Sequence, residues 1–228
     1  SNESLSEFQI LVIANALHGS NQKKWELPTP SAFSDEEIDS IVKFVEGGGS
    51  LFLIADHMPF PGAIEKLAAK FGVRFENGFN ATKNAKGLEP ANVEFRRSDG
   101  GIAKHAITGG NGELPRIDQV TSFTGSVFRL KDDIAKASPL LVLGKGSYVL
   151  NPKHAWKFVQ GTQRKEASGW LQGAAIEHGK GRVTVFAEAA MFTAQRSGSK
   201  RMGMHAPGAK DNQQLARNVL RWLSRGKQ

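Results

Sequence analysis

The sequence of 228 residues contains no cysteine and only one tyrosine. The absence of cysteine excludes disulfide bonds, thiolate metal ligands and a cysteine nucleophile. It leaves the compartment undetermined, because a cysteine-free chain suits the cytoplasm and an exported protein equally. No stretch approaches 18 consecutive apolar residues, so the sequence predicts no membrane span. We therefore expect a soluble protein, cytoplasmic or exported.

Acidic residues are also in the minority. The chain carries 30 Lys and Arg against 22 Asp and Glu, a formal net charge of +8. A basic balance can indicate nucleic-acid binding. Here most of the basic residues are scattered, and no basic run is interleaved with aromatic residues, which argues against a nucleic-acid partner. The composition does not predict an oligomeric state.

The first third of the chain predicts alternating strands and helices. An apolar strand at residues 10–14 precedes a helix that begins at Ser34, where Ser34 and Glu37 form a capping box. Glycines 47–49 end this helix, and a five-residue apolar strand follows at residues 51–55. The strand–helix–strand order predicts a right-handed βαβ unit with parallel strands. A further helix at 62–71 and a short strand at 73–75 extend the alternation, which favours a parallel sheet with helices on both faces.

The remaining segments are less regular. Residues 79–90 are polar and predict an exposed loop. The last third predicts an antiparallel hairpin turned at residues 178–181 and a final helix at 211–224. We see no linker, so residues 1–228 predict a single α/β domain. Moderate strand candidates lie at 93–95, 120–123 and 140–143.

Two adjacent polar residues, Asp56 and His57, follow the second predicted strand directly. Ligands gather at the carboxyl ends of strands in open α/β sheets. Pro59 and Pro61 predict a turn in which the two side chains could cooperate as an orienting acid and a base. The alternative is structural, with Asp56 capping the turn and His57 filling the sheet edge.

Other polar residues are expected near the same edge. Asn15 and His18 follow the first strand, and parallel neighbours end on one side, so both are ligand-binding candidates. Glu188 ends a buried strand, where a carboxylate costs free energy unless it is paired or hydrated. We place it with Asp56 and His57 as a catalytic candidate, and Gln195 as a weaker ligand-binding one. The alternatives are a turn at Asn15, a solvated His18 and a capping role for Glu188.

Metal and cofactor motifs are absent from the sequence. A metal could be imagined on His18, Asp56, His57 and Glu188, but no H-E-x-x-H or comparable ligand spacing occurs. Neither G-x-G-x-x-G nor a P-loop is present. The sequence therefore predicts neither a metal site nor a cofactor.

Several segments together resemble a known superfamily. These are FSDEEIDSIVKFVEGGGSLFLIADH, IAKHAITGG at residues 102–110, and the closing GKGRVTVFAEAAMF with DNQQLARNVLRWLS. They are similar to the class I glutamine-amidotransferase-like superfamily, to its trehalose-utilisation-like branches in the central turn, and to uncharacterised bacterial members overall. The resemblance implies a flavodoxin-like three-layer α/β sandwich with a mainly parallel central sheet.

The chain departs from that superfamily at two points. It lacks the cysteine nucleophile of the G-x-C-x-G elbow, and no glycine-flanked serine elbow replaces it. Glutamine hydrolysis by that route is excluded. The superfamily also has a strand and a helix before the strand that residues 10–14 resemble, so an N-terminal unit could be missing here.

Three functions compete on these observations. The first is binding of a small molecule or a carbohydrate at the carboxyl edge of the parallel strands, without chemistry. The second is a hydrolase in which Asp56, His57 and Glu188 activate water, with or without a metal. The third is a protein-interaction scaffold. We rank them in that order.

Overall fold

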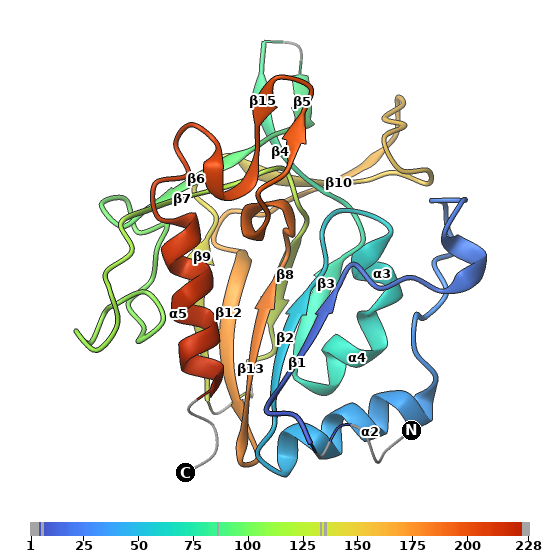
Figure 1. Cartoon of the computed structure of the whole chain (residues 1–228). Coiled ribbons are helices and arrows are strands. Elements are labelled where there is room, and N and C mark those ends of the chain that lie inside the picture. The colour runs from blue at the N-terminus through green and yellow to red at the C-terminus, as the bar shows by residue number, and fades with distance from the viewer. Residues whose placement is uncertain (1–4, 6, 86, 133, 135, 225–228) are drawn as a thin grey trace.

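The computed structural model describes residue 5 and residues 7–85, 87–132, 134 and 136–224. Figure 1 shows the helices and strands. In chain order they are β1 (Ile10–Ala14), η1 (Gly19–Asn21), α2 (Asp35–Glu46), β2 (Ser50–Ile54), α3 (Phe60–Ala63), α4 (Glu65–Lys70), β3 (Val73–Glu76), β4 (Phe79–Asn84), β5 (Gly87–Pro90), β6 (Val93–Arg96), β7 (Gln119–Ser122), β8 (Val127–Leu130), β9 (Ala137–Val142), β10 (Ser147–Asn151), β11 (Gln163–Glu166), β12 (Leu171–His178), β13 (Gly181–Phe186), η2 (Ala190–Phe192), β14 (Arg196–Ser197), β15 (Lys200–Arg201), η3 (Gly203–His205) and α5 (Asn212–Ser224).

A seven-stranded mixed sheet organises the chain. Its strand order is β1-β2-β13-β12-β8-β3, and β9 also pairs with β12. Among the described strands, only β1–β2 and β2–β13 pair in parallel, and every other pairing is antiparallel. A four-stranded sheet, β11-β10-β4-β5, and two two-stranded sheets, β6-β7 and β14-β15, complete the β structure.

The predicted fold class is therefore wrong. The chain is not a flavodoxin-like, mainly parallel three-layer α/β sandwich, because antiparallel pairings dominate its sheets. The strand predicted at 73–75 exists, but it lies at the far edge, antiparallel to β8. Residues 79–90, predicted as an exposed loop, form β4 and β5, with Phe79 and Ala81 fully buried. A short apolar run predicts a strand but not its direction, which the intervening segments decide.

The parallel pairing of the first two strands and the helix between them are as predicted. β1 and β2 pair in parallel, with Ile10 opposite Ser50 and Ala14 opposite Ile54. Ser34 caps α2: its side chain accepts from the Glu37 amide, and the Glu37 carboxylate accepts from the Ser34 amide. The two reciprocal bonds satisfy amides that a helix start leaves free. The predicted hairpin is also present as β12 and β13.

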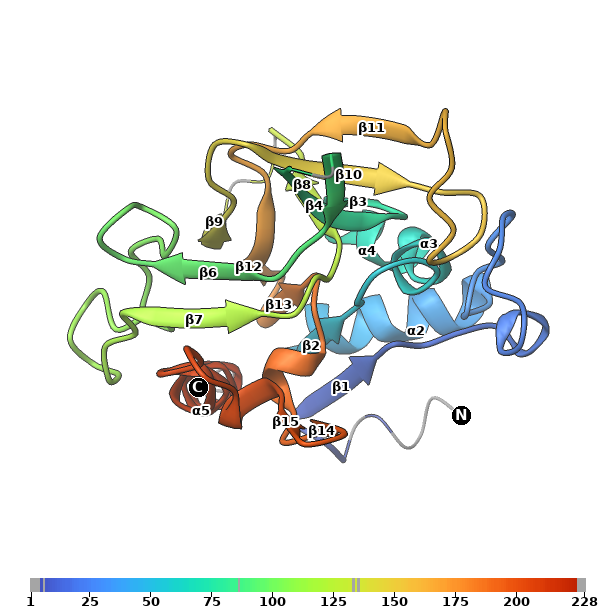
Figure 2. The ribbon, with the colours of Figure 1, turned by 90° about the horizontal axis from the view of Figure 1, so that it is seen from above.

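The core lies on both faces of the large sheet. Alternate residues of the fully buried β2 point to opposite faces. Leu51 and Leu53 join the cluster that α2 and α4 cover, whereas Phe52 and Ile54 join the cluster that α5 covers. Figure 2 shows α2 and α4 on one side of β1, β2 and β13, and α5 on the other. In the described residues no helix is long and apolar enough to cross a membrane.

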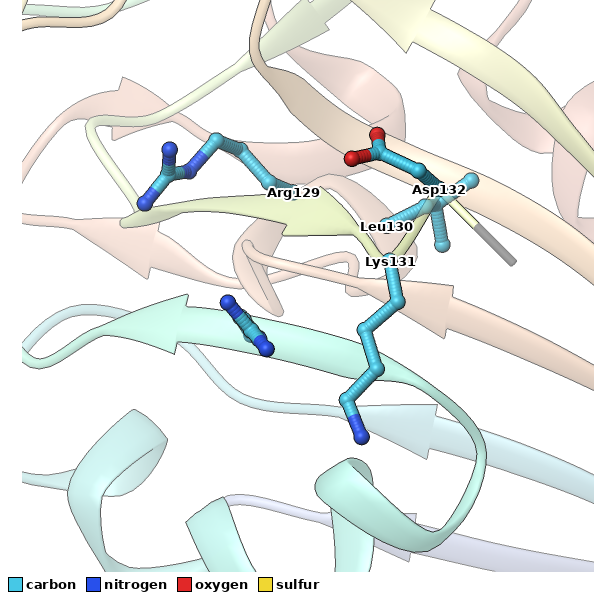
Figure 3. Close-up of a pocket in the computed structure, with 5 residues that line it drawn as sticks. Arg129, Leu130, Lys131 and Asp132 are labelled. Atoms are coloured by element: carbon cyan, nitrogen blue, oxygen red, sulfur yellow. The ribbon is translucent and has the colours of Figure 1, made fainter. Parts of the chain in front are cut away.

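The sheet ends in two different edges. β1 forms one edge, and β3 forms the other beside β8. At the second edge Arg74 lies directly opposite Arg129. Figure 3 shows Arg129, Leu130 and Lys131 following one another from the end of β8 into the turn beyond it.

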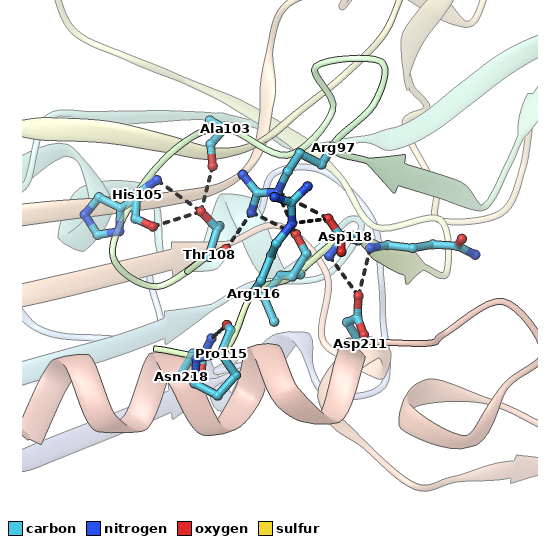
Figure 4. A network of polar contacts seen from close by, with 11 residues as sticks. Arg97, Ala103, His105, Thr108, Pro115, Arg116, Asp118, Asp211 and Asn218 are labelled. Atoms are coloured by element: carbon cyan, nitrogen blue, oxygen red, sulfur yellow. Dashed lines mark hydrogen bonds and ion pairs between the residues drawn. The ribbon is translucent and has the colours of Figure 1, made fainter. Parts of the chain in front are cut away.

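Helix α5 also fixes an irregular segment, residues 97–118. Asn218 Nδ2 donates to the carbonyl oxygens of Ile107 and Pro115, both at 2.8 Å. The Asp211 carboxylate accepts from the amides of Asp118 and Gln119. Figure 4 shows these contacts together with Arg97 and Thr108, which bond within the segment. The segment is thus held in place without regular secondary structure.

His105 lies in the same segment and has a structural environment. Its amide donates to Thr108 Oγ1 at 3.0 Å, and its ring packs edge-on against Trp222. Burial lowers the pKa of His105, which favours the neutral ring.

Candidate functional site

Three polar side chains follow the three parallel strands. Asn15 comes directly after β1, Asp56 two residues after β2, and Glu188 two residues after β13. Because β1, β2 and β13 run in the same direction, their carboxyl ends meet at one edge of the sheet. The predicted juxtaposition of these residues therefore has a structural basis, although the sheet as a whole is not parallel.

Asn15 and Asp56 are joined directly. Asn15 Oδ1 accepts from the Asp56 amide at 2.9 Å, and the Asn15 amide donates to the Ile54 carbonyl oxygen at 3.0 Å. The Asp56 carboxylate in turn accepts from the His57 amide at 2.7 Å. These bonds fix the turn after β2, so that Asp56 is half-buried and keeps contact with the surface.

Glu188 is fully buried and is bonded to backbone amides. Its two carboxylate oxygens accept from the amides of Ala190, at 2.6 Å, and Met191, at 2.8 Å. The Phe123 amide also donates to this carboxylate. A methyl group at Gly125 would lie 2.8 Å from Glu188 Cβ, so only glycine leaves room for this packing. The alternative that Glu188 caps the following turn thus describes its contacts well.

The pKa of both carboxyl groups is raised. Burial raises the pKa of Glu188 well above its usual value, and repulsion from Asp56 raises it further. Burial also raises the pKa of Asp56, against the opposing effects of nearby His57 and of the His57 and Ala189 amides. Two carboxyl groups that repel each other when both are charged do not both ionise readily. The pair therefore holds a proton more strongly than ordinary acids do.

His57 stands in an aromatic cluster. Its ring stacks on Phe79 at 4.7 Å between centroids and 13° between planes, and meets Trp156 edge-on at 4.7 Å. Trp25 and Phe60 lie 6.0 Å away. His57 Nδ1 bonds to the Met58 carbonyl oxygen at 2.8 Å, and because a carbonyl only accepts, Nδ1 carries a proton. We name these five residues, Trp25, His57, Phe60, Phe79 and Trp156, the aromatic cluster.

Backbone strain is concentrated here. In the described part of the chain, the non-glycine residues with positive φ are Asn15 (51°), Thr124 (73°) and Trp156 (64°). Asn15 bonds to Asp56, Thr124 adjoins the Phe123 amide that binds Glu188, and Trp156 belongs to the aromatic cluster. For a β-branched or bulky residue this conformation is a true outlier. Such strain typically gathers at functional sites, where the surrounding structure maintains it.

Two predicted ligand-binding residues have other environments. His18 is exposed, and its Nδ1 bonds to Ser20 Oγ at 2.7 Å at the start of η1. Gln195 is exposed at the base of the β14–β15 hairpin, where its carbonyl accepts from the Met202 amide. Among the described residues, neither side chain forms a hydrogen bond or an ion pair with Asp56 or Glu188. In that same part of the chain, no group of three or more His, Asp or Glu side chains is placed to hold a metal ion.

Sequence reasoning missed most of the aromatic cluster. Trp156 lies in a segment for which the sequence predicted no helix or strand, and this residue is 51% exposed beside His57. Phe79 was assigned to an exposed loop, although it is fully buried. Trp25, Phe79 and Trp156 are distant in the sequence from one another and from the neighbouring His57 and Phe60, so no local pattern could have grouped all five.

Solved structures share the fold at low sequence identity. The N-terminal domain of mmIFT52 matches with a TM-score of 0.61 and 15% identity over 100% of this chain and 82% of that chain. The cytoplasmic protein STM3548 from Salmonella typhimurium matches at 0.52 and 14%, over 98% and 74%. A putative ThuA-like protein from Bacteroides uniformis matches at 0.50 and 12%, over 97% and 71%. No protein-family model and no curated protein sequence matches the chain. At these identities, the comparisons show that this chain shares its fold with these structures, and they show nothing of its activity.

Proposed function

We propose that the chain binds a small polar molecule of the carbohydrate class at the carboxyl edge of β1, β2 and β13. A relationship to the class I glutamine-amidotransferase-like superfamily is part of the proposal, without amidotransferase activity because the chain has no cysteine. The similarity to the putative ThuA-like protein is compatible with this relationship.

The main support is the exposed indole of Trp156 next to polar groups. A sugar ring has an apolar face of C–H groups and a rim of hydroxyl groups. Trp156, 51% exposed and held edge-on against His57, offers an apolar surface for the face. Asp56 adjoins His57 and offers carboxylate oxygens for the rim. Apolar surface with a few fixed polar groups is the usual composition of a ligand site.

Binding can be tested by calorimetric titration with glucose, galactose, mannose, N-acetylglucosamine, maltose and cellobiose. We expect at least one of these sugars to bind, and Trp156→Ala and Asp56→Asn to weaken its binding about tenfold or more. Phe8→Ala is the matched control, because Phe8 is 57% exposed at the opposite end of β1. Absence of binding by every sugar, or equal losses in Phe8→Ala and Trp156→Ala, would refute the proposal.

A second candidate function is hydrolysis, favoured by the raised pKa of Asp56. A half-buried carboxyl group that holds its proton above the usual range can act as a general acid. Glu188 is fully buried and bonded to amides, so it would act as a positioning residue that affects Asp56 through charge. Turnover of a bound oligosaccharide that Asp56→Asn abolishes would establish this function, and intact sugar after long incubation with wild type would exclude it for that ligand.

A further inference from the structure

A second polar site lies at the opposite edge of the large sheet. A surface cavity of about 400 Å³ is lined by Arg74 from β3 and by Arg129, Leu130, Lys131 and Asp132 at the end of β8. The strand order places β8 and β3 beyond β12, away from β1, β2 and β13. This cavity is therefore independent of the proposed carbohydrate site.

The cavity brings like charges together. Arg74 and Arg129 are direct cross-strand partners in the antiparallel pair, an arrangement that destabilises a sheet when the charges are alike. Lys131 adds a third cation. Nearby Glu76 does not neutralise them, because its carboxylate bonds to Lys165 at 2.8 Å and to Asn151 at 2.8 Å. Among the described residues that line the cavity, Asp132 supplies one negative charge against three positive ones.

A neighbouring aromatic ring orients one of the two arginines. The Arg129 guanidinium lies 4.4 Å from the centre of the Trp170 ring, and this stacking restrains its orientation. A guanidinium donates two parallel hydrogen bonds to a phosphate or sulfate group, which a lysine cannot do. In Figure 3 the Lys131 and Asp132 side chains leave the backbone in opposite directions, so the carboxylate points away from the ammonium group.

We propose that this cavity binds the tetrahedral oxyanion group, phosphate or sulfate, of a small molecule. An anion seated between Arg74 and Arg129 would remove their repulsion and complete their hydrogen bonds. The volume of the cavity is in the range typical of small-molecule sites. The net charge of +8 would draw such ligands to the protein, but only the paired arginines would hold them in place.

The experiment is calorimetric titration of the full chain with inorganic phosphate and, separately, with inorganic sulfate, at constant ionic strength set with chloride. Wild type should bind at least one of the two, and the preferred ion identifies the group. Arg74→Gln and Arg129→Gln should each weaken binding about tenfold or more, since each removes charge-assisted bonds. Absence of binding to both anions would overturn the proposal.

Three further variants separate the cavity from overall charge. Arg217→Gln, on the exposed face of α5, makes the same charge change elsewhere and should leave anion binding unchanged. Arg129→Lys keeps the positive charge but loses the two parallel guanidinium hydrogen bonds and the stacking on Trp170, so anion binding should weaken. If an arginine variant does not fold, Lys131→Gln serves in its place. Equal weakening by Arg217→Gln and Arg74→Gln would overturn the proposal, because it would show attraction to net charge alone.

Discussion

The parallel part of the large sheet and its β3–β8 edge each hold a pair of like charges, and the protein tolerates the two pairs in opposite ways. Asp56, which is half-buried, and Glu188, which is fully buried, follow neighbouring parallel strands, and burial raises the pKa of both acids. Arg74 and Arg129 face each other on the exposed edge pair, where water solvates them. An arginine does not lose its proton, so solvent or an anion must compensate its charge. Burial therefore makes the two acids bind a proton more tightly, whereas exposure leaves the two arginines accessible to a ligand.

The largest expected effect on stability comes from removing the buried Glu188 carboxyl group. Glu188→Ala leaves the amides of Ala190, Met191 and Phe123 without their acceptor in a buried place. Each unsatisfied buried amide costs about 1–3 kcal/mol, so we expect a loss of about 4 kcal/mol in the free energy of unfolding. Urea denaturation measures it.

Glu177→Ala is the control for this variant. Glu177 is exposed on β12 and faces Lys136 at 3.6 Å, an exposed ion pair of small value. Its loss should change the free energy of unfolding by less than about 1 kcal/mol. Equal effects of the two substitutions would contradict the structural role of the Glu188 carboxylate.

A medium effect concerns pH. The folded-state pKa of Glu188 is raised above its ordinary value of 4.5, so the folded state binds the proton more tightly than the unfolded state. The stability that this proton contributes is complete below pH 4.5 and is lost as pH rises through the raised pKa. Glu188→Gln cannot titrate and lacks this contribution.

The measurement is urea denaturation of wild type and Glu188→Gln at several pH values from about 4 to 8. The stability of wild type relative to the variant should fall as pH rises, by at most about 1.4 kcal/mol per pH unit for one proton. Residual titration in Glu188→Gln is assigned to Asp56, whose pKa is shifted in the same direction. A difference that grows with pH would mean that Glu188 is ionised in the folded protein.

The smallest expected effect on stability comes from the exposed pair of Arg74 and Arg129. In buffer without phosphate or sulfate, Arg74→Gln removes the repulsion from Arg129 and should raise the free energy of unfolding by about 0.2–1 kcal/mol. Arg217→Gln serves as the reference for loss of one positive charge. Destabilisation of Arg74→Gln beyond that of Arg217→Gln would show that Arg74 supports the fold through contacts other than charge.

The sequence predicted the local parts of this fold well. The capping box at Ser34, the two parallel strands β1 and β2, the hairpin and the last helix all carry signals within a few residues. The overall class was mispredicted, because the direction and partner of β3, β8 and β9 depend on segments without such signals. β4 was missed for a related reason: its polar residues alternate with buried Phe79 and Ala81 over only a few positions.

Some residues of the candidate sites could likewise be predicted from the sequence, and others could not. Asn15, Asp56 and Glu188 could be grouped from the sequence, because each follows a strand of the parallel set. Trp156 and the arginine pair could not, since Trp156 reaches His57, and Arg74 meets Arg129, only through long-range packing. Their proximity is a property of the fold and not of any local motif.

The ties between α5 and residues 97–118 have a consequence for biosynthesis. Asn218 bonds to the carbonyl of Ile107, 111 positions earlier in the chain. A ribosome must therefore add more than a hundred residues after Ile107 before this anchor exists. Until then residues 97–118 lack the partners that α5 supplies. The turn around His105 is therefore among the last parts of the nascent chain to fold.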